Sequence, residues 1–379
     1  MKRMLCFISA QPLPNFIPVN EPETRPDALH CVYTPNDKQM ERRFNDLRVV
    51  LQKLYPAVQV IGVKVAGAYD AQAIQRKCFE LLKEFPGDEW SLNCTGGTKL
   101  MSAPAMEVFK LKGLQDVMNL SIYYIETSRK VILKVASDDW QLSEIKFTGT
   151  IEVEKYFALY GREVVVGKPQ TVQEAQLLWH LQQLNWHVWP SVHLKAQRRN
   201  DADDRDLAEY DAIGIDGYQL YAFECKKLSD AGPDEDQQKK INNLFSSDTY
   251  KLFQVRQGFG GPFGKSYWVF EGTAKLRQAS LERLELFSVR LISRKQLSEI
   301  SKTPISFGLP PRKPDALTKL PNPNQLKQQW GIQQGVNSSG DVSRTNRESS
   351  PTTKIQPSAV AKFNPLMSSI QKVSKKNQS

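Results

Sequence analysis

Residues 210–226 read YDAIGIDGYQLYAFECK, a turn signal set between two runs in which apolar and polar side chains alternate. Asp216-Gly217 at the centre is a strong signal for a two-residue β-hairpin turn. The stretch therefore predicts two antiparallel strands, and with this turn Ile215 faces Tyr218.

The same register places three reactive side chains close together. Asp211 lies opposite Ala222, and Glu224 is its diagonal neighbour on the same face. Side chains alternate along a strand, so Glu224 and Lys226 share a face. We therefore expect Asp211, Glu224 and Lys226 to converge.

Two carboxylates on adjacent strands suit Mg²⁺ or Mn²⁺, which are hard ions that take oxygen ligands. We expect the metal ligands to be Asp211, Glu224 and the backbone carbonyl of Cys225. Such a metal lowers the pKa of a bound water and neutralises charge on a phosphate, while Lys226 orients that water or stabilises the transition state. The pattern predicts a metal-dependent phosphodiesterase site.

Two other interpretations of this hairpin stay open. A Glu-x-Lys pair also occurs as an ordinary ion pair on a solvated strand. A ligand-responsive module or transcription regulator that grips nucleic acid without cutting it is a hypothesis of a different class. The presence of Asp211 across the hairpin from an intact Glu224 and Lys226 favours catalysis.

The elements predicted around the hairpin follow the order helix, three strands, helix, strand. With Asp211, Glu224 and Lys226 in the motif positions, this order resembles the PD-(D/E)XK nuclease superfamily, although Tyr210 replaces the proline of the family name. The resemblance implies a restriction-endonuclease-like domain with these three residues as catalytic groups and Glu174 as an additional helical acid. The predicted elements are a helix at 172–184, a strand at 187–192, a helix at 236–258 and a strand at 266–270.

The first 150 residues alternate β-branched or aromatic runs with amphipathic stretches, which is typical of a parallel α/β sheet. We predict a doubly wound α/β fold, with antiparallel additions at 128–150. The predicted strands are 4–9, 58–63, 91–93 and 122–125, and the predicted helices are 38–54, 71–83 and 100–112.

A second motif, NCTGGTK at 93–99, ends a predicted strand and opens a helix. Backbone N–H groups at such a helix start, with Thr95, Thr98 and Lys99, can hold a phosphate. A tight strand-to-helix turn explains the two glycines equally well. The spacing is not that of a Walker motif, so hydrolysis of a nucleoside triphosphate is not indicated.

The loop after the first strand, SAQPLPN at 9–15, falls at the same edge of the sheet, where open α/β sheets bind ligands. The two loops resemble those of the CRISPR-associated Rossmann-fold (CARF) domain, in the subgroup that joins it to a PD-(D/E)XK nuclease through similar SxQPxPN and NxTGGTK loops. The segment 250–265 resembles this subgroup too. The ligand contacts that the resemblance implies are Gln11, Pro12, Asn15, Thr95, Gly96, Gly97, Thr98 and Lys99.

The resemblance implies an effector of type III CRISPR defence that cyclic tetra-adenylate activates and that cuts DNA, RNA or both with Mn²⁺ or Mg²⁺. A cyclic oligoadenylate with two-fold symmetry fits a homodimer, because each subunit presents the same loop to half of the ring. CARF proteins also occur with a helical ribonuclease domain marked by an Arg shortly before a His. The match at Arg25 and His30 lies in a Pro-containing loop, and we interpret it as chance.

A length of 379 residues suits two domains and a tail. From Ser301 onward, twelve Lys and Arg face three Asp and Glu, which accounts for most of the net charge of +10. This part is poor in large apolar groups, so we expect a disordered basic tail that can add phosphate contacts. The expected divisions are a CARF domain at 1–150, a linker helix and loop at 151–170, a nuclease domain at 171–302 and the tail at 303–379.

Five scattered cysteines without a CxxC pair favour a cytoplasmic protein. No apolar run approaches the roughly 20 residues of a membrane helix, so no membrane association is expected. We expect Trp179, Trp186 and Trp189 to pack in a core rather than stack on bases. The charged segment 198–206 is predicted to form a loop at the lip of the nuclease site.

Overall fold

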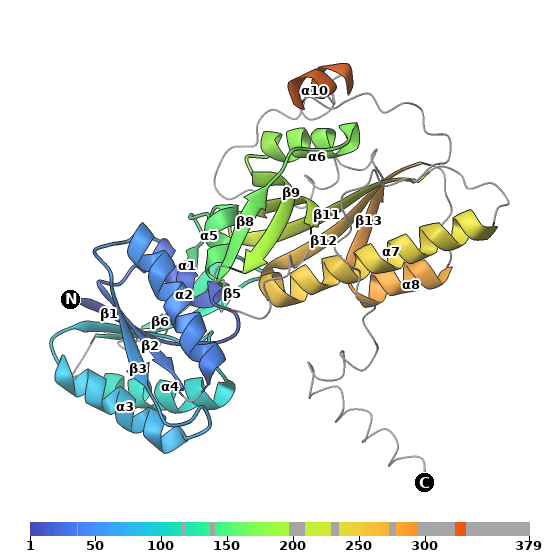
Figure 1. Ribbon diagram of the computed structural model, residues 1–379. Helices are drawn as coiled ribbons and strands as arrows, with labels where there is room; N and C mark the ends of the chain where they lie inside the picture. The colour runs from blue at the N-terminus through green and yellow to red at the C-terminus, as the bar shows by residue number, and fades with distance from the viewer. Residues whose placement is uncertain are drawn as a thin grey trace, which may run out of the picture. The chain divides into compact units, whose positions relative to one another are not determined.

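The computed structural model contains two β-sheets, one of seven strands and one of six (Figure 1). The predicted lip loop at 198–206 lies outside the described residues, and so does the basic tail apart from α10 (Pro323–Trp330). The structure describes residues 1–35, 37–114, 119–136, 141–196, 209–228, 235–272, 278–293 and 323–330.

The N-terminal sheet has seven strands in the order β3-β2-β1-β4-β5-β6-β7. Neighbours from β3 to β5 are parallel, while β6 and β7 add antiparallel strands, as the sequence predicted for residues 128–150. The strands are β1 (Lys2–Phe7), β2 (Ala28–Tyr33), β3 (Gln59–Lys64), β4 (Glu89–Asn93), β5 (Leu120–Glu126), β6 (Val131–Ala136) and β7 (Leu142–Lys146).

Helices cover both faces of this sheet, which confirms the mixed α/β prediction (Figure 1). The starts of α2 and α3 are explained by Asp37 and Asp70, whose carboxylates accept hydrogen bonds from the first backbone N–H groups of each helix. The helices are α1 (Leu13–Asn20), α2 (Lys38–Leu54), α3 (Ala71–Glu84) and α4 (Lys99–Leu114).

Two elements of this half were not predicted, namely β2 and α1. Prolines concealed α1, because the segment LPNFIPVN contains Pro14 and Pro18. Pro14 lies in the first turn, where a missing N–H costs nothing, and the helix continues through Pro18. The last three residues of the predicted loop at 9–15 therefore belong to α1, which begins at Leu13.

The C-terminal sheet has six strands in the order β13-β12-β11-β10-β9-β8. Its first four strands along the chain are antiparallel neighbours, and β11, β12 and β13 are parallel. The strands are β8 (Arg162–Val166), β9 (His187–Ala196), β10 (Glu209–Asp216), β11 (Gln219–Leu228), β12 (Gly264–Gly272) and β13 (Val289–Ser293).

Figure 1 shows α6 on one side of this sheet and α7 with α8 on the other. Apolar side chains of α6 pack with Phe223 and Cys225 of β11, whereas Phe245 and Leu252 of α7 belong to the cluster that contains Ala222. The helices are α5 (Val153–Ala158), α6 (Val172–Gln183), α7 (Glu235–Val255) and α8 (Gln278–Leu286), and a π-helical turn η1 (Arg256–Gly260) and a 3₁₀ turn η2 (Gly261–Phe263) follow α7.

The segment predicted as a linker at 151–170 contains a strand. Helix α5 lies there as expected, but β8 follows it and pairs with β9 as the edge strand of the C-terminal sheet. Gly161, between α5 and β8, has a φ of +65°, and a side chain there would press on the Asp46 carboxylate. The glycine allows the sharp turn that starts the strand.

The predicted register of the hairpin was wrong, because the two-residue turn lies one residue further along the chain than predicted. The loop residues are Gly217 and Tyr218, and Ile215 pairs with Leu220. Gly217 has a φ of +62°, and a glycine with positive φ at the first loop position is typical of a type II′ turn. Asp216 stays in the strand, where it pairs with the Lys130 ammonium at 3.6 Å. Continued along the strands, this register sets Asp211 directly opposite Glu224 rather than diagonal to it.

The hairpin turn is anchored to the N-terminal half of the chain. The Tyr218 hydroxyl donates to Oε1 of Glu21 at 2.7 Å, and both side chains are about 1% exposed. The same carboxylate accepts hydrogen bonds from the backbone N–H groups of Thr148 and Gly149 at 3.0 and 2.9 Å. These hydrogen bonds therefore fix the position of the turn between the two strands that carry the candidate nuclease residues.

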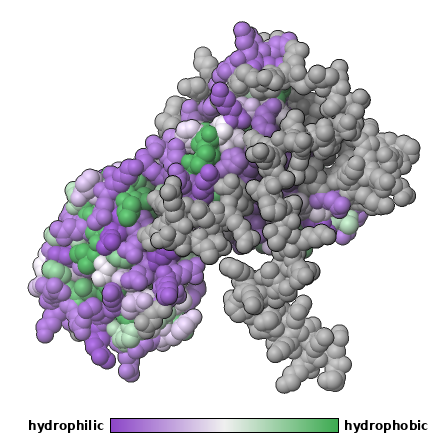
Figure 2. Space-filling model, in the orientation of Figure 1, coloured by the Kyte–Doolittle hydropathy of each residue, from purple (hydrophilic) through white to green (hydrophobic). Residues whose placement is uncertain are grey.

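On the face drawn in Figure 2, hydrophobic residues form separate patches among hydrophilic ones. No helix in the part of the chain that the structure describes is long and apolar enough to cross a membrane.

Candidate functional sites

Strands β10 and β11 bring Asp211, Glu224 and Lys226 together. Glu224 is 0% exposed, and Lys226 Nζ lies 3.6 Å from its Oε2. Asp211 accepts a hydrogen bond from the backbone N–H of Cys225 through Oδ2 at 2.6 Å. Because Glu224 and Lys226 alternate with the buried Cys225, they face α7 while the Cys225 thiol packs on the α6 side.

Helix α7 adds two charged groups that the sequence reading did not assign to the site. Asp248 Oδ2 lies 3.4 Å from Lys226 Nζ, and the Lys251 ammonium forms an ion pair with Oε1 of Glu224. Lys251 Nζ also donates to the backbone carbonyl of Glu209 at 2.7 Å. The signal available was an Asp-x-x-Lys spacing, which puts both side chains on one face of the helix that follows the hairpin.

Burial and mutual repulsion shift the acids of this centre. Burial raises the pKa of Glu224 to about 8, and the nearby charge of Asp211 adds to the shift. Burial also raises the pKa of Asp211. For Lys226, burial lowers the pKa, but the charges of Asp211, Glu224 and Asp248 outweigh it and raise the pKa above its usual value. The lysine is therefore a permanent cation beside acids that resist ionisation.

The centre has fewer positive than negative groups. Among the described side chains, four acids and two lysines give a net charge of −2 when every group is ionised, and a divalent cation would neutralise it. The acids are Asp211, Glu224, Asp248 and Glu174, and the lysines are Lys226 and Lys251.

Glu174 lies at the first turn of α6 and is engaged there in capping. Its backbone N–H donates to Thr171 Oγ1 at 3.2 Å, and its carboxylate accepts from the Thr171 hydroxyl at 3.0 Å and from the backbone N–H of Gln170 at 2.8 Å. Burial raises the pKa of Glu174 to about 7, with Asp211 the next cause. The charge of Asp211 thus acts on Glu174, and each Glu174 oxygen accepts one capping hydrogen bond.

The donor set fits a hard divalent cation. Asp211 and Glu224 supply oxygens, and in the described residues no hydrogen bond of good geometry reaches either Glu224 oxygen, whose charge is met by Lys226 and Lys251. The described residues contain no group of three His, Cys, Asp or Glu side chains arranged as metal ligands. The expected set has two carboxylates and relies on the Cys225 carbonyl and on water for the rest.

The N-terminal loops meet where the strand order of the sheet reverses. In the order β3-β2-β1-β4-β5 this switch point lies between β1 and β4, and the loops after these two strands are the predicted ligand loops. A side chain at Gly96 would collide with the carbonyl oxygen of Phe7, and Gly97 has a φ of +73°. Both glycines are thus required by close packing, so they do not by themselves indicate a ligand.

Several of the predicted ligand contacts also form hydrogen bonds that hold the loops together. Asn15 is 0% exposed and donates to Phe7 O at 2.8 Å, while Asn93 donates to Asn15 Oδ1 at 3.1 Å. Thr95 Oγ1 accepts from the backbone N–H of Ile125 at 2.7 Å. These side chains shape the site, and Pro12 caps α1.

Thr98 and Lys99 differ from these scaffold residues. Lys99 is exposed at the first residue of α4, and the buried Thr98 Oγ1 has no hydrogen-bond partner in the described residues. A helix start with an exposed cation and an unpaired hydroxyl is suited to an anion. Of the predicted ligand contacts, these two carry the chemistry that a phosphate requires.

Gln11 connects the first loop to the segment after α7. Its Oε1 accepts from the Tyr160 hydroxyl at 2.7 Å, and its Nε2 donates to Gln257 O at 3.4 Å. A side chain at Gly261, where the backbone has a φ of +50°, would press on this amide. The predicted ligand contact is therefore also a contact between the two halves of the chain.

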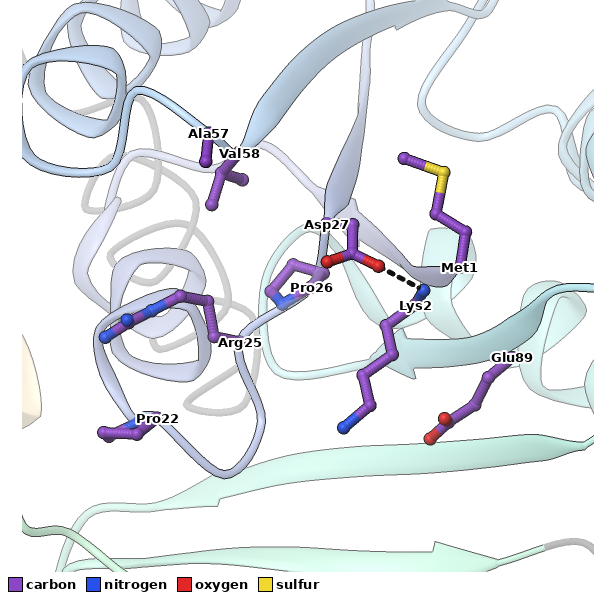
Figure 3. A pocket seen from close by; sticks show the side chains of 9 residues that line it. All are labelled: Met1, Lys2, Pro22, Arg25, Pro26, Asp27, Ala57, Val58 and Glu89. Atoms are coloured by element: carbon purple, nitrogen blue, oxygen red, sulfur yellow. Dashed lines mark hydrogen bonds between the residues drawn. The ribbon is translucent and has the colours of Figure 1, made fainter.

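The pocket in Figure 3 belongs to neither site. It has a volume of about 520 Å³ and is lined by residues such as Lys2, Asp27 and Glu89 at the amino ends of the parallel strands. The backbone N–H of Lys2 donates to Asp27 Oδ2 at 2.8 Å across it. The two predicted loops lie at the opposite, carboxyl edge of the same sheet.

A comparison with known families gives a match within the N-terminal half. Residues 4–156 match the family model of the Card1 CARF domain. The matched range covers the N-terminal sheet and α5, and the fold there is a CARF-like Rossmann fold, as the loop motifs indicated. No curated protein sequence matches the chain.

Solved structures with a similar fold are distant in sequence. The protein VC1899 from Vibrio cholerae is 15% identical with a TM-score of 0.59, over 79% of this chain and 96% of that one. Can2 from Sulfobacillus thermosulfidooxidans, in complex with cyclic tetra-adenylate, is 19% identical with a TM-score of 0.59, over 79% and 98%. A type III CRISPR defence DNA nuclease activated by cyclic oligoadenylate is 15% identical with a TM-score of 0.53, over 81% and 53%. At these identities the likeness establishes the fold.

Proposed function

We propose that the chain is a nuclease of type III CRISPR defence in which the CARF-like domain binds a cyclic oligoadenylate and the C-terminal domain cuts nucleic acid with a divalent metal. The observation that carries the proposal is the buried centre in which Asp211 and Glu224 lie beside the cation Lys226. The match of residues 4–156 to a CARF family supports the sensing half.

Asp211, Glu224 and the carbonyl of Cys225 would hold Mn²⁺ or Mg²⁺. The excess of negative charge among the described groups of the centre and the complete burial of Glu224 support this assignment. When bound there, such a cation would lower the pKa of a coordinated water and neutralise charge on the phosphate.

The chain's own groups then orient the reaction. Lys226 stays protonated, since the surrounding acids raise its pKa, and its ammonium positions the attacking water or stabilises the charge that develops on the phosphate. Asp248 holds this ammonium from α7 at 3.4 Å. Glu174 places a further acid near the charge of Asp211 from α6, where its carboxylate also caps the helix.

The proposed activator is cyclic tetra-adenylate, the ligand of the Can2 structure. Thr98 and Lys99 bind its phosphate groups at the start of α4, and Gln11 lies on the neighbouring loop. A two-fold symmetric ring calls for a homodimer. Three exposed apolar side chains near the carboxyl edge of the sheet, Tyr69, Leu100 and Tyr124, suit such an interface.

The substrate is DNA, RNA or both, and a DNA nuclease among the structures of similar fold supports DNA. Phosphodiester cleavage is expected in either case.

The test is cleavage of labelled single-stranded DNA, RNA and plasmid by the purified full chain with Mn²⁺ and cyclic tetra-adenylate. Wild-type protein cuts at least one substrate, while Asp211→Asn, Glu224→Gln and Lys226→Met each reduce the rate by more than about a hundredfold. Wild-type protein that binds nucleic acid but cuts none of the three would replace the nuclease with a ligand-responsive binding module.

A further inference from the structure

Helix α7 presents a pair of opposite charges to the Glu-x-Lys motif of β11. Asp248 and Lys251 are three residues apart, so they lie on one face of the helix. Asp248 contacts Lys226, and Lys251 contacts Glu224. Each charged residue of the motif therefore has a partner of opposite sign on the same helix.

Lys251 is itself fixed in place. Its ammonium donates to Glu209 O on β10 at 2.7 Å and lies 5.5 Å from the ring centre of Tyr210. The side chain is 23% exposed, while the Glu224 carboxylate that it contacts is completely buried. Lys251 thus joins β10, β11 and α7 at the buried Glu224 carboxylate.

We propose that Lys251 is a positioning residue for the metal site, an inference that rests on the proposed function. Its ammonium holds Glu224 through Oε1 and so keeps the carboxylate in the orientation in which it binds the metal together with Asp211. A glutamate side chain has three rotatable bonds, and without this contact the carboxylate is free to turn toward Lys226, which lies 3.6 Å from Oε2. Groups that orient a metal ligand commonly affect metal affinity by about 10- to 100-fold.

The test measures Mn²⁺ binding to the full chain by calorimetry, without nucleic acid. Lys251→Met is expected to weaken Mn²⁺ binding by about tenfold. Lys251→Arg, which keeps the positive charge and a donor for Glu209 O, is expected to bind Mn²⁺ like wild type. Lys155→Met is the matched control, because Lys155 forms its ion pair with Glu152, away from the centre. Affinity that is unchanged or higher in Lys251→Met would overturn the proposal. Wild-type protein that binds no Mn²⁺ would contradict the proposed function itself.

A second measurement tests the contact without any metal. Urea unfolding of Glu224→Gln, Lys251→Met and the double variant forms a thermodynamic cycle. If Lys251 holds Glu224, the effects of the two substitutions on the free energy of unfolding are not additive. Additive effects would show that the two side chains do not interact. This result would contradict the positioning role of Lys251 even in a protein that binds Mn²⁺ and cuts DNA.

Discussion

At the scale of single residues, His30 shows how folding changes the chemistry of a side chain. It is 2% exposed on β2, lies 3.3 Å from an Arg3 nitrogen, and packs against Trp90 with ring centres 5.0 Å apart. Burial lowers its pKa from 6.5 to about 4, and the positive charge of Arg3 adds to the shift. The folded chain therefore keeps this imidazole neutral.

The lowered pKa of His30 predicts a loss of stability in mild acid. Above pH 6.5 the ring is neutral in both states, whereas between pH 6.5 and 4 only the unfolded chain takes up the proton, so the free energy of unfolding falls as the pH falls. The contribution is at most about 3 kcal/mol. Urea unfolding at pH 7.5 and pH 5 measures it, and His30→Gln should lose less stability between the two values than wild type. Equal losses would contradict the assigned cause.

Substitution of Lys99 is expected to weaken ligand binding without lowering the stability of the fold. The side chain is exposed at the start of α4, so Lys99→Ala leaves the unfolding midpoint unchanged and weakens binding of cyclic tetra-adenylate by about tenfold or more. Calorimetry with the ring as titrant gives the affinity, and Lys53→Ala, on the exposed end of α2, is the control. If both variants bind like wild type, the phosphate contact is elsewhere.

The residues that the sequence predicted are those set by local periodicity. Alternation along a strand was enough to group Asp211, Glu224 and Lys226, although the turn was one step away from its predicted place. The contacts of Asp248 and Lys251 could not be predicted in this way, because they depend on which face of α7 packs against β11. Long-range packing determines that face. The capping of α6 by Glu174 follows from the Thr-x-x-Glu pattern, a signal that we did not use.

At the scale of elements, the β10–β11 hairpin depends on its turn. Tyr218 is buried at the turn, where its hydroxyl donates to Glu21 and accepts from the Asn20 amide at 2.6 Å. Ile151 N also donates to Gly217 O at 3.1 Å. The turn is therefore bound by the end of α1 and by the chain between β7 and α5.

Removal of the Tyr218 hydroxyl should destabilise the fold. Tyr218→Phe removes one hydrogen bond from the Glu21 carboxylate and one from the Asn20 amide, at a cost of about 1–3 kcal/mol in the free energy of unfolding. Chemical denaturation measures the difference, and Tyr69→Phe, at a side chain 75% exposed, is expected to change it little. A Tyr218→Phe variant as stable as wild type would mean that the hydrogen bonds of the Tyr218 hydroxyl do not hold the turn.

Among the elements, strongly periodic segments were predicted well and short or proline-containing ones were not. Helix α2 has the predicted bounds, because its amphipathic pattern is long and Asp37 marks its start. Strand β2 is buried on both faces, so its sequence ALHCVY shows no alternation that would separate it from a loop. Strand β8 was missed because five residues between two glycines resemble a linker.

At the scale of the whole molecule, α7 and its continuation touch both candidate sites. Lys251 contacts Glu224 in the C-terminal domain, and Gln257 in the π-helical turn after α7 accepts a hydrogen bond from Gln11 in the first ligand loop. A ring that binds through Gln11 changes a contact of this segment. The ligand can favour cleavage only if it binds one arrangement of the segment more tightly than another.

The central claim is that binding of a ring by the CARF-like domain controls cleavage by the C-terminal domain. The most direct test is the initial rate of cleavage of the best substrate with Mn²⁺, at a fixed concentration of the full chain and increasing cyclic tetra-adenylate. We predict a rate near zero without the ring that rises and saturates at one ring per two chains. An equal rate with and without the ring, under conditions where Glu224→Gln is inactive, would contradict the control of cleavage by the ring.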